Sequence, residues 1–381
     1  MTRAGVYLSL PFCPSHCAYC SNPAARFSAE KGEAYLLRLL RELETAAPDW
    51  AAHTVDTVYI GGGTPTLFAP EQIRRLLEGV ARHLNLAADA EITSEANPES
   101  VTPTSTAGLI AAGVNRISIG AQSFQERHLL ALGRIHTPER VATAVQIARD
   151  AGFSNLSLDL IFSLPDQRPE EWADDLSRLI DLRPDHVSAY GLAIENGTPL
   201  WVQVQTGKVR VPDAEGYDAL YSAAVERLAA AGYRRYEVSN FARPGFECRH
   251  NLGYWRGGDY LGLGAGAASH RDGYRYGQMD DVNAYLKQPP GFQPSTHAER
   301  LTPRQRAHER AIFGLRTAEG IDLNDIQAAT GIDLAAIAAV ELERLVASGL
   351  ITGDGERFRP TPRGFLFGDS VGAALAHLPD E

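Results

Sequence analysis

Short apolar runs of strand length alternate with amphipathic stretches of helix length over the first 231 residues. This alternation is typical of βαβ units, in which consecutive strands lie parallel and a helix crosses over between them. The predicted strands are Val6–Leu10, Thr57–Ile60, Ala90–Ser94, Arg116–Gly120, Ser157–Phe162 and His186–Ala193. The predicted helices are about 29–47, 70–84, 103–112, 137–151, 169–183 and 213–231. Six parallel strands of this kind predict an incomplete α/β barrel.

The pattern changes from about residue 300 onward. Three helical stretches (Arg304–Leu315, Leu323–Thr330 and Leu334–Ser348) precede two strand-like runs, Gly349–Thr352 and Phe358–Thr361. That order predicts a small winged-helix-like α+β domain. Because the Pro- and Gly-rich segment 288–291 marks a boundary, we expect a barrel domain over residues 1–290 and a C-terminal domain over 295–381. Residues from about 195 to 290 would form an extension of the barrel.

Composition and charge exclude several classes of function. The 381 residues are 44% hydrophobic and 22% charged, which is ordinary for a globular protein. The net charge of −11 argues against nucleic-acid binding, and residues 300–381 carry 9 basic and 12 acidic side chains. We therefore expect the C-terminal domain to be structural or to dock a partner. The sequence contains neither an apolar run of about 18 residues nor a signal-peptide pattern, so we expect a cytoplasmic protein.

Three of the four cysteines lie close together, at the spacing Cys-x3-Cys-x2-Cys: Cys13, Cys17 and Cys20. In a cytosolic chain, clustered thiols are more often metal ligands than disulfides. A structural zinc site needs four ligands, so His16 or Cys248 would have to complete it. Three thiolates suit a four-iron cluster with one iron left open for a small molecule. We favour the cluster, with zinc as the alternative.

A glycine-rich turn, Gly61–Thr66, follows the second predicted strand. Consecutive glycines let the backbone pass close to a ligand and adopt positive φ. Later strands end at or near polar residues or glycine: Glu95, Gln122, Asp159 and Gly191. Singly, each would suit a structural hydrogen bond. Together they favour one site, because parallel barrels carry their active sites at the carboxyl ends of the strands.

These features occur in the order seen in the radical S-adenosylmethionine enzymes. More closely, the chain resembles the anaerobic coproporphyrinogen III oxidase family and its HemW branch. The matching motifs are Tyr7–Cys20, Gly61–Thr66, Glu95–Pro98, Gly120–Phe124, Asp159–Ile161 and His250–Trp255. The resemblance implies an α/β fold built on a partial parallel (β/α)6 barrel of radical S-adenosylmethionine type, with the family's extension over about 195–290.

The resemblance also implies cofactors and the residues that hold them. A [4Fe–4S] cluster would be ligated by Cys13, Cys17 and Cys20. S-adenosylmethionine would be held by Tyr7, Gly62, Gly63, Thr64, Glu95, Gln122, Arg134 and Asp159, with Gly191 at the same site. The residue types suit these roles, since Glu95 can accept hydrogen bonds from the cofactor's ammonium and Arg134 can pair with its carboxylate.

Two branches of the family share this core, and the sequence favours the haem chaperones over the oxidases. The oxidases carry a long N-terminal extension and a further cysteine two positions after the last ligand. In this chain the first ligand is residue 13, and Asn22 occupies that later position. Ser21-Asn22-Pro23 also replaces the Asp-Phe pair usual in the HemW branch.

We therefore expect a haem chaperone that passes haem to acceptor haem proteins. The alternative is an oxygen-independent coproporphyrinogen III oxidase, a radical oxidative decarboxylase, whose activity we do not expect here. Whether the chain is an enzyme at all stays open. Expected partners are haem and acceptors such as respiratory cytochromes, without nucleic acid, and with membrane contact only through the acceptors.

The segment Cys248–Trp255 matches His-Asn-x-x-Tyr-Trp, the motif that the HemW branch associates with haem. His250 is the candidate haem ligand, because histidine is a common axial ligand and the aromatic neighbours offer an apolar wall. Cys248 is a second candidate. In the alternative interpretation, His250 stabilises a loop beside the barrel. The following run, Asp259–Ala267, is rich in glycines that suit close backbone approach or a tight turn.

Overall fold

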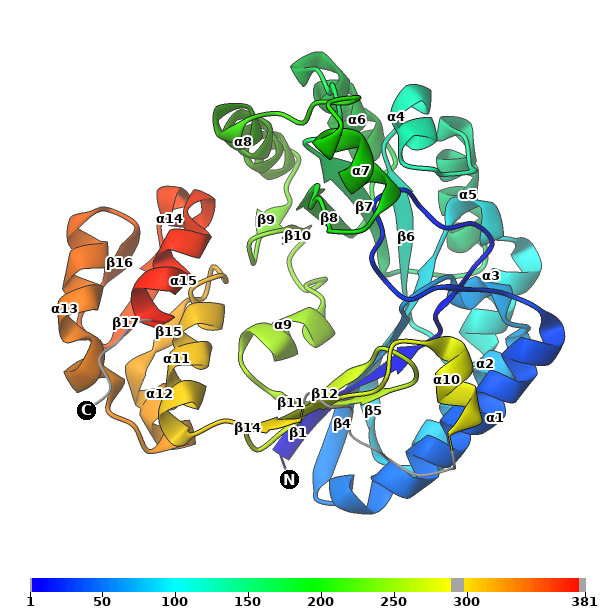
Figure 1. Cartoon of the computed structure of the whole chain (residues 1–381), viewed down its shortest axis with the longest axis horizontal. Helices are drawn as coiled ribbons and strands as arrows, with labels where there is room; N and C mark the ends of the chain where they lie inside the picture. Colours follow the sequence, from blue (N-terminus) through cyan, green and yellow to red (C-terminus); the bar gives the residue numbers. More distant parts are fainter. Residues whose placement is uncertain (1, 289–297, 377–381) are drawn as a thin grey trace.

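The computed structural model describes residues 2–288 and 298–376, and its main feature is an open barrel of parallel strands with helices outside it (Figure 1). Six parallel strands follow one another in chain order: β1 (Thr2–Ser9), β4 (His53–Gly61), β5 (Asn85–Ala96), β6 (Arg116–Gln122), β7 (Leu156–Phe162) and β8 (His186–Gly191). Every strand predicted for the barrel overlaps one of these six strands. The partial parallel barrel is confirmed.

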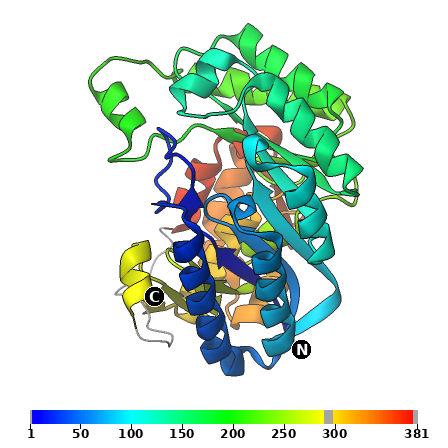
Figure 2. The same ribbon diagram turned by 90° about the vertical axis from the view of Figure 1, so that its right-hand side faces the viewer.

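The crossover helices line up along the outside of the barrel (Figure 2). They are α1 (Ala29–Ala46), α2 (Pro70–His83), α3 (Pro103–Ala111), α5 (Pro138–Asp150) and α6 (Pro169–Asp181). On α1, Leu36, Leu39 and Leu43 are buried at a spacing of three to four residues, which gives the helix one apolar face. Its first turn is capped by the Ser28 hydroxyl, which accepts a hydrogen bond from the Lys31 N–H at 3.2 Å.

Strands from the extension lengthen the barrel sheet at both edges. β11 (Asp259–Leu263) pairs parallel with β1, and β10 (Asn240–Ala242) pairs antiparallel with β8. The glycine-rich run Asp259–Ala267 thus contains a strand that the pattern did not predict. The close approach expected there does occur, because a Cβ on Gly262 would lie 2.0 Å from the Ala268 carbonyl oxygen. The remaining strands of this sheet are β9 (Arg234–Arg235), β12 (Ala268–Arg271), β13 (Tyr274–Gly277) and β14 (Glu299–Arg300).

Short helices that the pattern did not predict stand around the barrel mouth and beside the extension. They are α4 (Glu126–Ala131), α7 (Pro199–Gln205), α9 (Arg249–Trp255) and α10 (Val282–Lys287), whereas the predicted α8 is present at Ala214–Ala230. The helix α9 lies between the barrel and the C-terminal elements (Figure 1). A small two-stranded sheet, β2 (Phe12–Cys13) with β3 (Ala25–Arg26), brackets the cysteine loop.

The C-terminal elements have a core of their own, which contains Leu334, Leu342 and Phe358. They are α11 (Pro303–Gly314), α12 (Leu323–Thr330), α13 (Leu334–Ala347), α14 (Pro362–Leu366) and α15 (Gly368–Ala376), with the antiparallel sheet β15 (Ile321–Asp322), β17 (Arg357–Pro360) and β16 (Ile351–Gly353). The three predicted helices are present as α11, α12 and α13, and together with this sheet they confirm the small winged-helix-like domain, whereas α14 and α15 were not predicted. The boundary segment 289–291 lies outside the described residues, so the limits 1–290 and 295–381 stay predictions.

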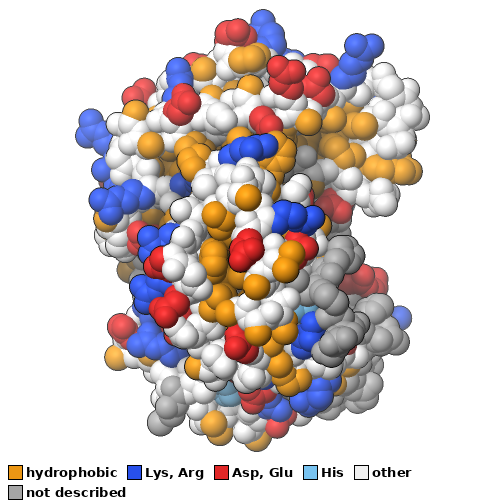
Figure 3. All heavy atoms as spheres, turned by 90° about the vertical axis from the view of Figure 1, so that its left-hand side faces the viewer, with side chains coloured by type: hydrophobic (Ala, Val, Ile, Leu, Met, Phe, Trp, Pro, Cys, Tyr) orange, Lys and Arg blue, Asp and Glu red, His pale blue; other side chains and the backbone are white. Residues whose placement is uncertain are grey.

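Acidic and basic side chains are interspersed over the face shown in Figure 3, with apolar side chains between them. Within the described ranges, no helix is long and apolar enough to cross a membrane.

Candidate functional site

A cavity of about 470 Å³ opens at the carboxyl ends of the parallel strands, beneath the cysteine loop. Its volume falls within the range of about 300–1,000 Å³ that is usual for small-molecule sites. Of the twelve residues expected to hold the cluster and S-adenosylmethionine, all but two line it: Cys13, Cys17, Cys20, Gly62, Gly63, Glu95, Gln122, Arg134, Asp159 and Gly191. We call this space the cysteine cavity. Tyr7 and Thr64 lie outside its lining.

The cysteine loop is held in place by segments far away in the sequence. The Ala18 N–H donates to the Leu132 carbonyl at 2.9 Å, and the Leu200 N–H at the start of α7 donates to the Ala18 carbonyl at 2.8 Å. Gly133, with φ of 72°, permits the close approach, since a Cβ there would lie 3.3 Å from the Ala18 nitrogen. These contacts orient the loop over the barrel mouth.

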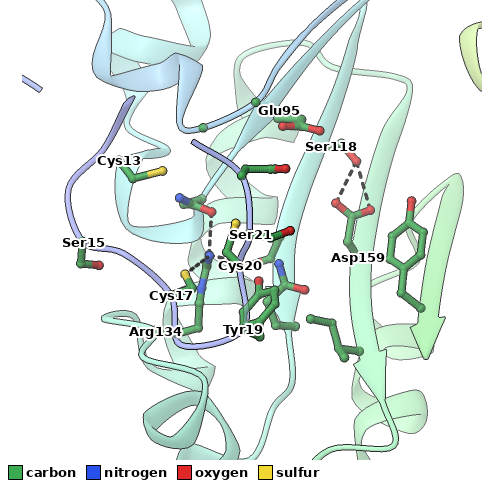
Figure 4. A pocket seen from close by; sticks show the side chains of 18 of the residues that line it. Cys13, Ser15, Cys17, Tyr19, Cys20, Ser21, Glu95, Ser118, Arg134 and Asp159 are labelled. Carbon is green, nitrogen blue, oxygen red and sulfur yellow. Dashed lines mark hydrogen bonds between the residues drawn. The ribbon is translucent and has the colours of Figure 1, made fainter. Parts of the chain in front are cut away.

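The three thiols share the cavity with the cation of Arg134 (Figure 4), and the Thr64 hydroxyl reaches one of them from outside the lining. Arg134 Nη1 lies 3.6 Å from Cys17 Sγ, and the Thr64 hydroxyl donates to Cys13 Sγ at 3.8 Å. Burial raises the pKa of the Cys13 and Cys20 thiols, and the neighbouring cysteines raise it further. Within the described ranges, no three His, Cys, Asp or Glu side chains are gathered as ligands of a single metal ion. The all-thiolate donor set fits an iron–sulfur cluster.

Asn97, which was not among the expected site residues, connects two of the cysteines through hydrogen bonds. Its Nδ2 donates to Thr64 Oγ1 at 2.8 Å, and its Oδ1 accepts from Arg134 Nη2 at 2.6 Å. A chain of polar contacts therefore leads from Cys13 through Thr64, Asn97 and Arg134 to Cys17. The available sequence signal was a polar residue directly after a predicted strand, two positions after Glu95 and within the same matching motif.

The glycine turn packs against the cysteine loop as well as lining the cavity. A Cβ on Gly63 would lie 2.6 Å from both the nitrogen and the oxygen of Phe12, and the Thr64 N–H donates to the Phe12 carbonyl at 2.8 Å. Gly62 has φ of 89°, and a Cβ there would lie 2.9 Å from Ser9 Oγ. Chain packing alone thus requires both glycines, and their contact with a cofactor stays a prediction.

Glu95 places an ionisable carboxyl in the wall of the cavity. It accepts hydrogen bonds from the Tyr59 hydroxyl at 3.0 Å and from the Gly62 N–H. Burial, together with the nearby Asp159 carboxylate, raises the pKa of Glu95 to about 7. A cation bound beside it would favour the ionised form, because opposite charge offsets the cost of burial.

Asp159 is held by hydroxyl groups from three strands. Ser118 donates to both carboxylate oxygens at 3.1 Å, and Ser157 and Ser188 donate to Oδ1 at 3.2 and 2.7 Å (Figure 4 shows the Ser118 bonds). Burial raises its pKa despite these donors. The Oδ2 atom retains room for another donor, since a carboxylate oxygen can accept two bonds. A ribose hydroxyl is the kind of donor expected.

A second cavity, of about 620 Å³, lies between the barrel, α9 and α11. Most of its large side chains are aromatic: Tyr7, Tyr190, Tyr254, Trp255, Tyr260 and Phe313. We call it the aromatic cavity. Tyr190 lines both cavities, so the two adjoin. Tyr7, which was expected to hold S-adenosylmethionine, lines the aromatic cavity and stacks on Tyr59 at a centroid distance of 6.1 Å.

His250 is buried beside the aromatic cavity rather than lining it. Its Nδ1 lies 2.8 Å from Thr57 Oγ1, and its Nε2 lies 2.8 Å from the Tyr254 hydroxyl. Burial lowers the pKa of His250 to about 3, so the imidazole is neutral. Both ring nitrogens have hydrogen-bond partners, and a haem ligand role stays a prediction. Cys248 is also buried, and its thiol donates to Glu91 Oε1 at 3.5 Å.

Comparison with known proteins shows similarity over nearly the whole chain. The model of the radical SAM superfamily matches residues 7–179, and that of the HemN C-terminal domain matches residues 301–367. The chain is 39% identical to heme chaperone HemW of Mycobacterium tuberculosis, over 96% of this chain and 93% of the relative. It is 32% identical to heme chaperone HemW of Bacillus subtilis, over 98% and 99%.

Among solved structures, the chain is similar to coproporphyrinogen III oxidase (HemN) from Escherichia coli. The TM-score is 0.82 at 24% identity, over 99% of this chain and 90% of that one, which shows a shared fold. The near full-length relatives carry the family assignment. The chain belongs to the HemW family within the radical SAM superfamily.

Proposed function

We propose that this protein is a haem chaperone, which binds haem and passes it to acceptor haem proteins. The observation that carries the proposal is the aromatic cavity, because the family's His-Asn-x-x-Tyr-Trp motif contributes Asn251, Tyr254 and Trp255 to its lining. A planar apolar macrocycle requires such aromatic walls. Relatives similar over nearly the full length bear the name heme chaperone HemW.

The cysteine cavity would hold the [4Fe–4S] cluster and S-adenosylmethionine that membership of the superfamily implies. Cys13, Cys17 and Cys20 would ligate three irons, which leaves the fourth for the cofactor. Arg134 would then offset the negative charge of the thiolates through its contact with Cys17. When bound, the cluster would supply electrons to the cofactor, and the residues of the cysteine cavity would bind and orient both groups.

S-adenosylmethionine would lie along the strand ends. Its ammonium would face Glu95 and its ribose would face Asp159 and Gln122, all of which line the cavity. Tyr7 and Thr64 would support the site indirectly, through residues that line the cavity. Thr64 bonds to Cys13 and Asn97, and Tyr7 contacts the glycine turn. Gly191 would form part of the wall.

His250 would help to bind haem by positioning Tyr254. Its Nε2 contact with the Tyr254 hydroxyl fixes that ring, which stands edge-on to Tyr260 at 4.6 Å in the wall of the aromatic cavity. Acceptor haem proteins, respiratory cytochromes among them, would receive the haem in the cytoplasm. Membrane contact would come only through such acceptors.

The test uses the full chain, purified anaerobically and reconstituted with iron and sulfide. Haem titration, transfer to an apo-haem protein and turnover of coproporphyrinogen III are measured on the same sample. We expect haem binding and transfer without turnover. Oxidative decarboxylation of coproporphyrinogen III without haem binding would replace the proposal with the oxidase alternative.

A further inference from the structure

We propose that His270 binds the haem iron through Nε2, inside the aromatic cavity. The inference rests on the proposed haem-binding function and names the iron ligand for it. His270 lies on β12 and lines the cavity together with Tyr254, Tyr260 and Phe313. It is the histidine among the residues that line this cavity in the described part of the chain.

The hydrogen bonds of His270 leave one ring nitrogen for a ligand. Its Nδ1 lies 3.3 Å from the Gly258 carbonyl oxygen and 3.5 Å from Asp259 Oδ1. Within the described ranges, the polar contacts of the ring are made by Nδ1. A metal-binding histidine typically donates its other N–H to a carbonyl or carboxylate, which fixes the tautomer and raises the basicity of the ligating nitrogen. His270 already has this arrangement.

Asp259, which contacts His270, is itself held in place by hydrogen bonds. Asp259 Oδ2 lies 3.1 Å from His53 Nε2, and the Asp272 N–H donates to Asp259 Oδ1 at 3.0 Å. Asp259 begins β11, the strand that pairs with β1 of the barrel. The carboxylate and the imidazole therefore belong to the sheet, and neither depends on a free loop.

His250, the histidine of the family motif, differs from His270 because both of its ring nitrogens have partners and because it does not line the aromatic cavity. Its two ring nitrogens contact Thr57 and Tyr254, each at 2.8 Å, and it is only 3% exposed. Ligation at its Nε2 would require the Tyr254 hydroxyl to move away. His270 needs no such rearrangement, so we assign the iron to His270 and the positioning of Tyr254 to His250.

The cavity around His270 suits haem in shape and charge. The ring of Tyr260 lies beside the imidazole of His270, with a centroid distance of 6.0 Å. Trp255 of α9 and Phe313 of α11 meet edge-on, with a centroid distance of 6.3 Å. Arg275 also lines the cavity and bonds to Glu299 at 2.7 Å and Glu309 at 3.2 Å. A haem propionate would take the place of one of these carboxylates on the guanidinium.

The test compares four single variants of the full, reconstituted chain: His270→Ala, Asp259→Asn, His250→Phe and, as a matched control on the outer helix α2, His83→Ala. Each is titrated with haem, and the absorption and electron paramagnetic resonance spectra of the complex are recorded. Iron content and melting temperature check the fold. Free imidazole is then added to each complex, because it can occupy the ligand position that His270→Ala leaves open.

His270→Ala should lose the histidine-ligated haem spectrum and bind haem more than tenfold more weakly, and imidazole should restore the spectrum. Asp259→Asn should weaken binding by about 10- to 100-fold, as expected for the partner of a ligating histidine. His250→Phe should weaken binding but keep the spectrum, and His83→Ala should match the wild type.

A wild-type spectrum in His270→Ala would overturn the inference, and its loss in His250→Phe alone would move the iron to His250. A tyrosinate-ligated spectrum in the wild type would also overturn it. Failure of the wild-type protein to bind haem would instead reject the proposed function itself.

Discussion

Burial controls the ionisation of single side chains at both cavities. Glu95, in the cysteine cavity, titrates near neutrality, whereas burial keeps the His250 imidazole neutral and raises the pKa of Cys248 to about 12. Burial raises the pKa of Cys13 and Cys20 as well, but the loop cysteines are only partly buried and line the cysteine cavity, whereas Cys248 is fully buried beside Glu91. A thiolate binds iron and a thiol does not, so the two environments imply different chemistry for the same residue type.

The pKa of Glu95 predicts how S-adenosylmethionine binding responds to pH. The carboxylate accepts from the cofactor's ammonium only when ionised, and its pKa of about 7 means that ionisation falls as the pH drops below neutrality. Affinity should rise about tenfold between pH 6 and 8 and then level off. Isothermal titration at several pH values measures this. Glu95→Gln should bind weakly with a flat profile, and an unchanged slope in that variant would assign the titration to another group.

Mutation should distinguish the three loop cysteines, which we expect to ligate iron, from Cys248, which we do not. Replacing Cys13, Cys17 and Cys20 together with Ala should abolish bound iron and the brown absorbance, because three irons lose their ligands. Cys248→Ala is the matched control and should keep about four irons per chain, since its buried thiol contacts Glu91 outside the cysteine cavity. Iron and sulfide analysis reads out both. Full iron content in the triple variant would contradict the cluster assignment.

The cysteine loop depends on its neighbours more than on its own sequence. It is bracketed by β2 and β3, and it bonds to the segment after α4 and to the start of α7. The turn after β4 supports it from below through the contact of Gly63 with Phe12. A displacement of any of these elements would therefore shift the backbone of the cysteine loop and, with it, the three cysteines.

Gly63→Ala tests this support. The added Cβ would lie 2.6 Å from the Phe12 backbone, which cannot move away without displacing Cys13. We expect a loss of about 1–3 kcal/mol in the free energy of unfolding and incomplete cluster assembly. Denaturant melts and iron analysis measure the two effects.

Gly253→Ala in α9 is the control for that substitution. Apart from its chain neighbours and the backbone of its own helix, nothing lies within 4 Å of the added Cβ, and the φ of Gly253 is not positive. Alanine there should be neutral or stabilise the protein by up to about 1 kcal/mol, because it favours a helix more than glycine does. Equal destabilisation by both variants would contradict the specific contact at Gly63.

At the scale of the whole molecule, the aromatic cavity exists because three parts of the chain meet. The barrel contributes Tyr7 and Tyr190, α9 contributes Tyr254 and Trp255, and α11 of the C-terminal domain contributes Phe313. The winged-helix-like domain thus forms a wall of the aromatic cavity.

Phe313→Ala should weaken haem binding without changing the iron ligand. Removal of an aromatic wall of this size costs about 1.5–3 kcal/mol, or roughly 10- to 100-fold in affinity. Haem titration with absorption spectra measures both properties. Phe367→Ala is the control, because that ring is 42% exposed and lies outside the aromatic cavity. Equal affinity in Phe313→Ala and the wild type would place haem elsewhere.

The sequence by itself determined the order of the βα units, the cysteine loop and most residues of the cysteine cavity. Strand and helix periods are local properties, and the ends of parallel strands meet at one edge, so the sequence alone predicts that Glu95, Gln122 and Asp159 lie together. The family could likewise be recognised from the sequence, because each of its motifs is a short, continuous stretch of the chain.

Only the tertiary structure decided which cavity each residue faces. Strand β11 joins β1 across more than 250 residues of sequence, and that pairing places Asp259 and His270 beside the barrel. Tyr7 faces the aromatic cavity, Asn97 connects two cysteines, and both nitrogens of His250 are bonded. Burial and hydrogen bonding of this kind depend on partners remote in the chain, which no local pattern encodes.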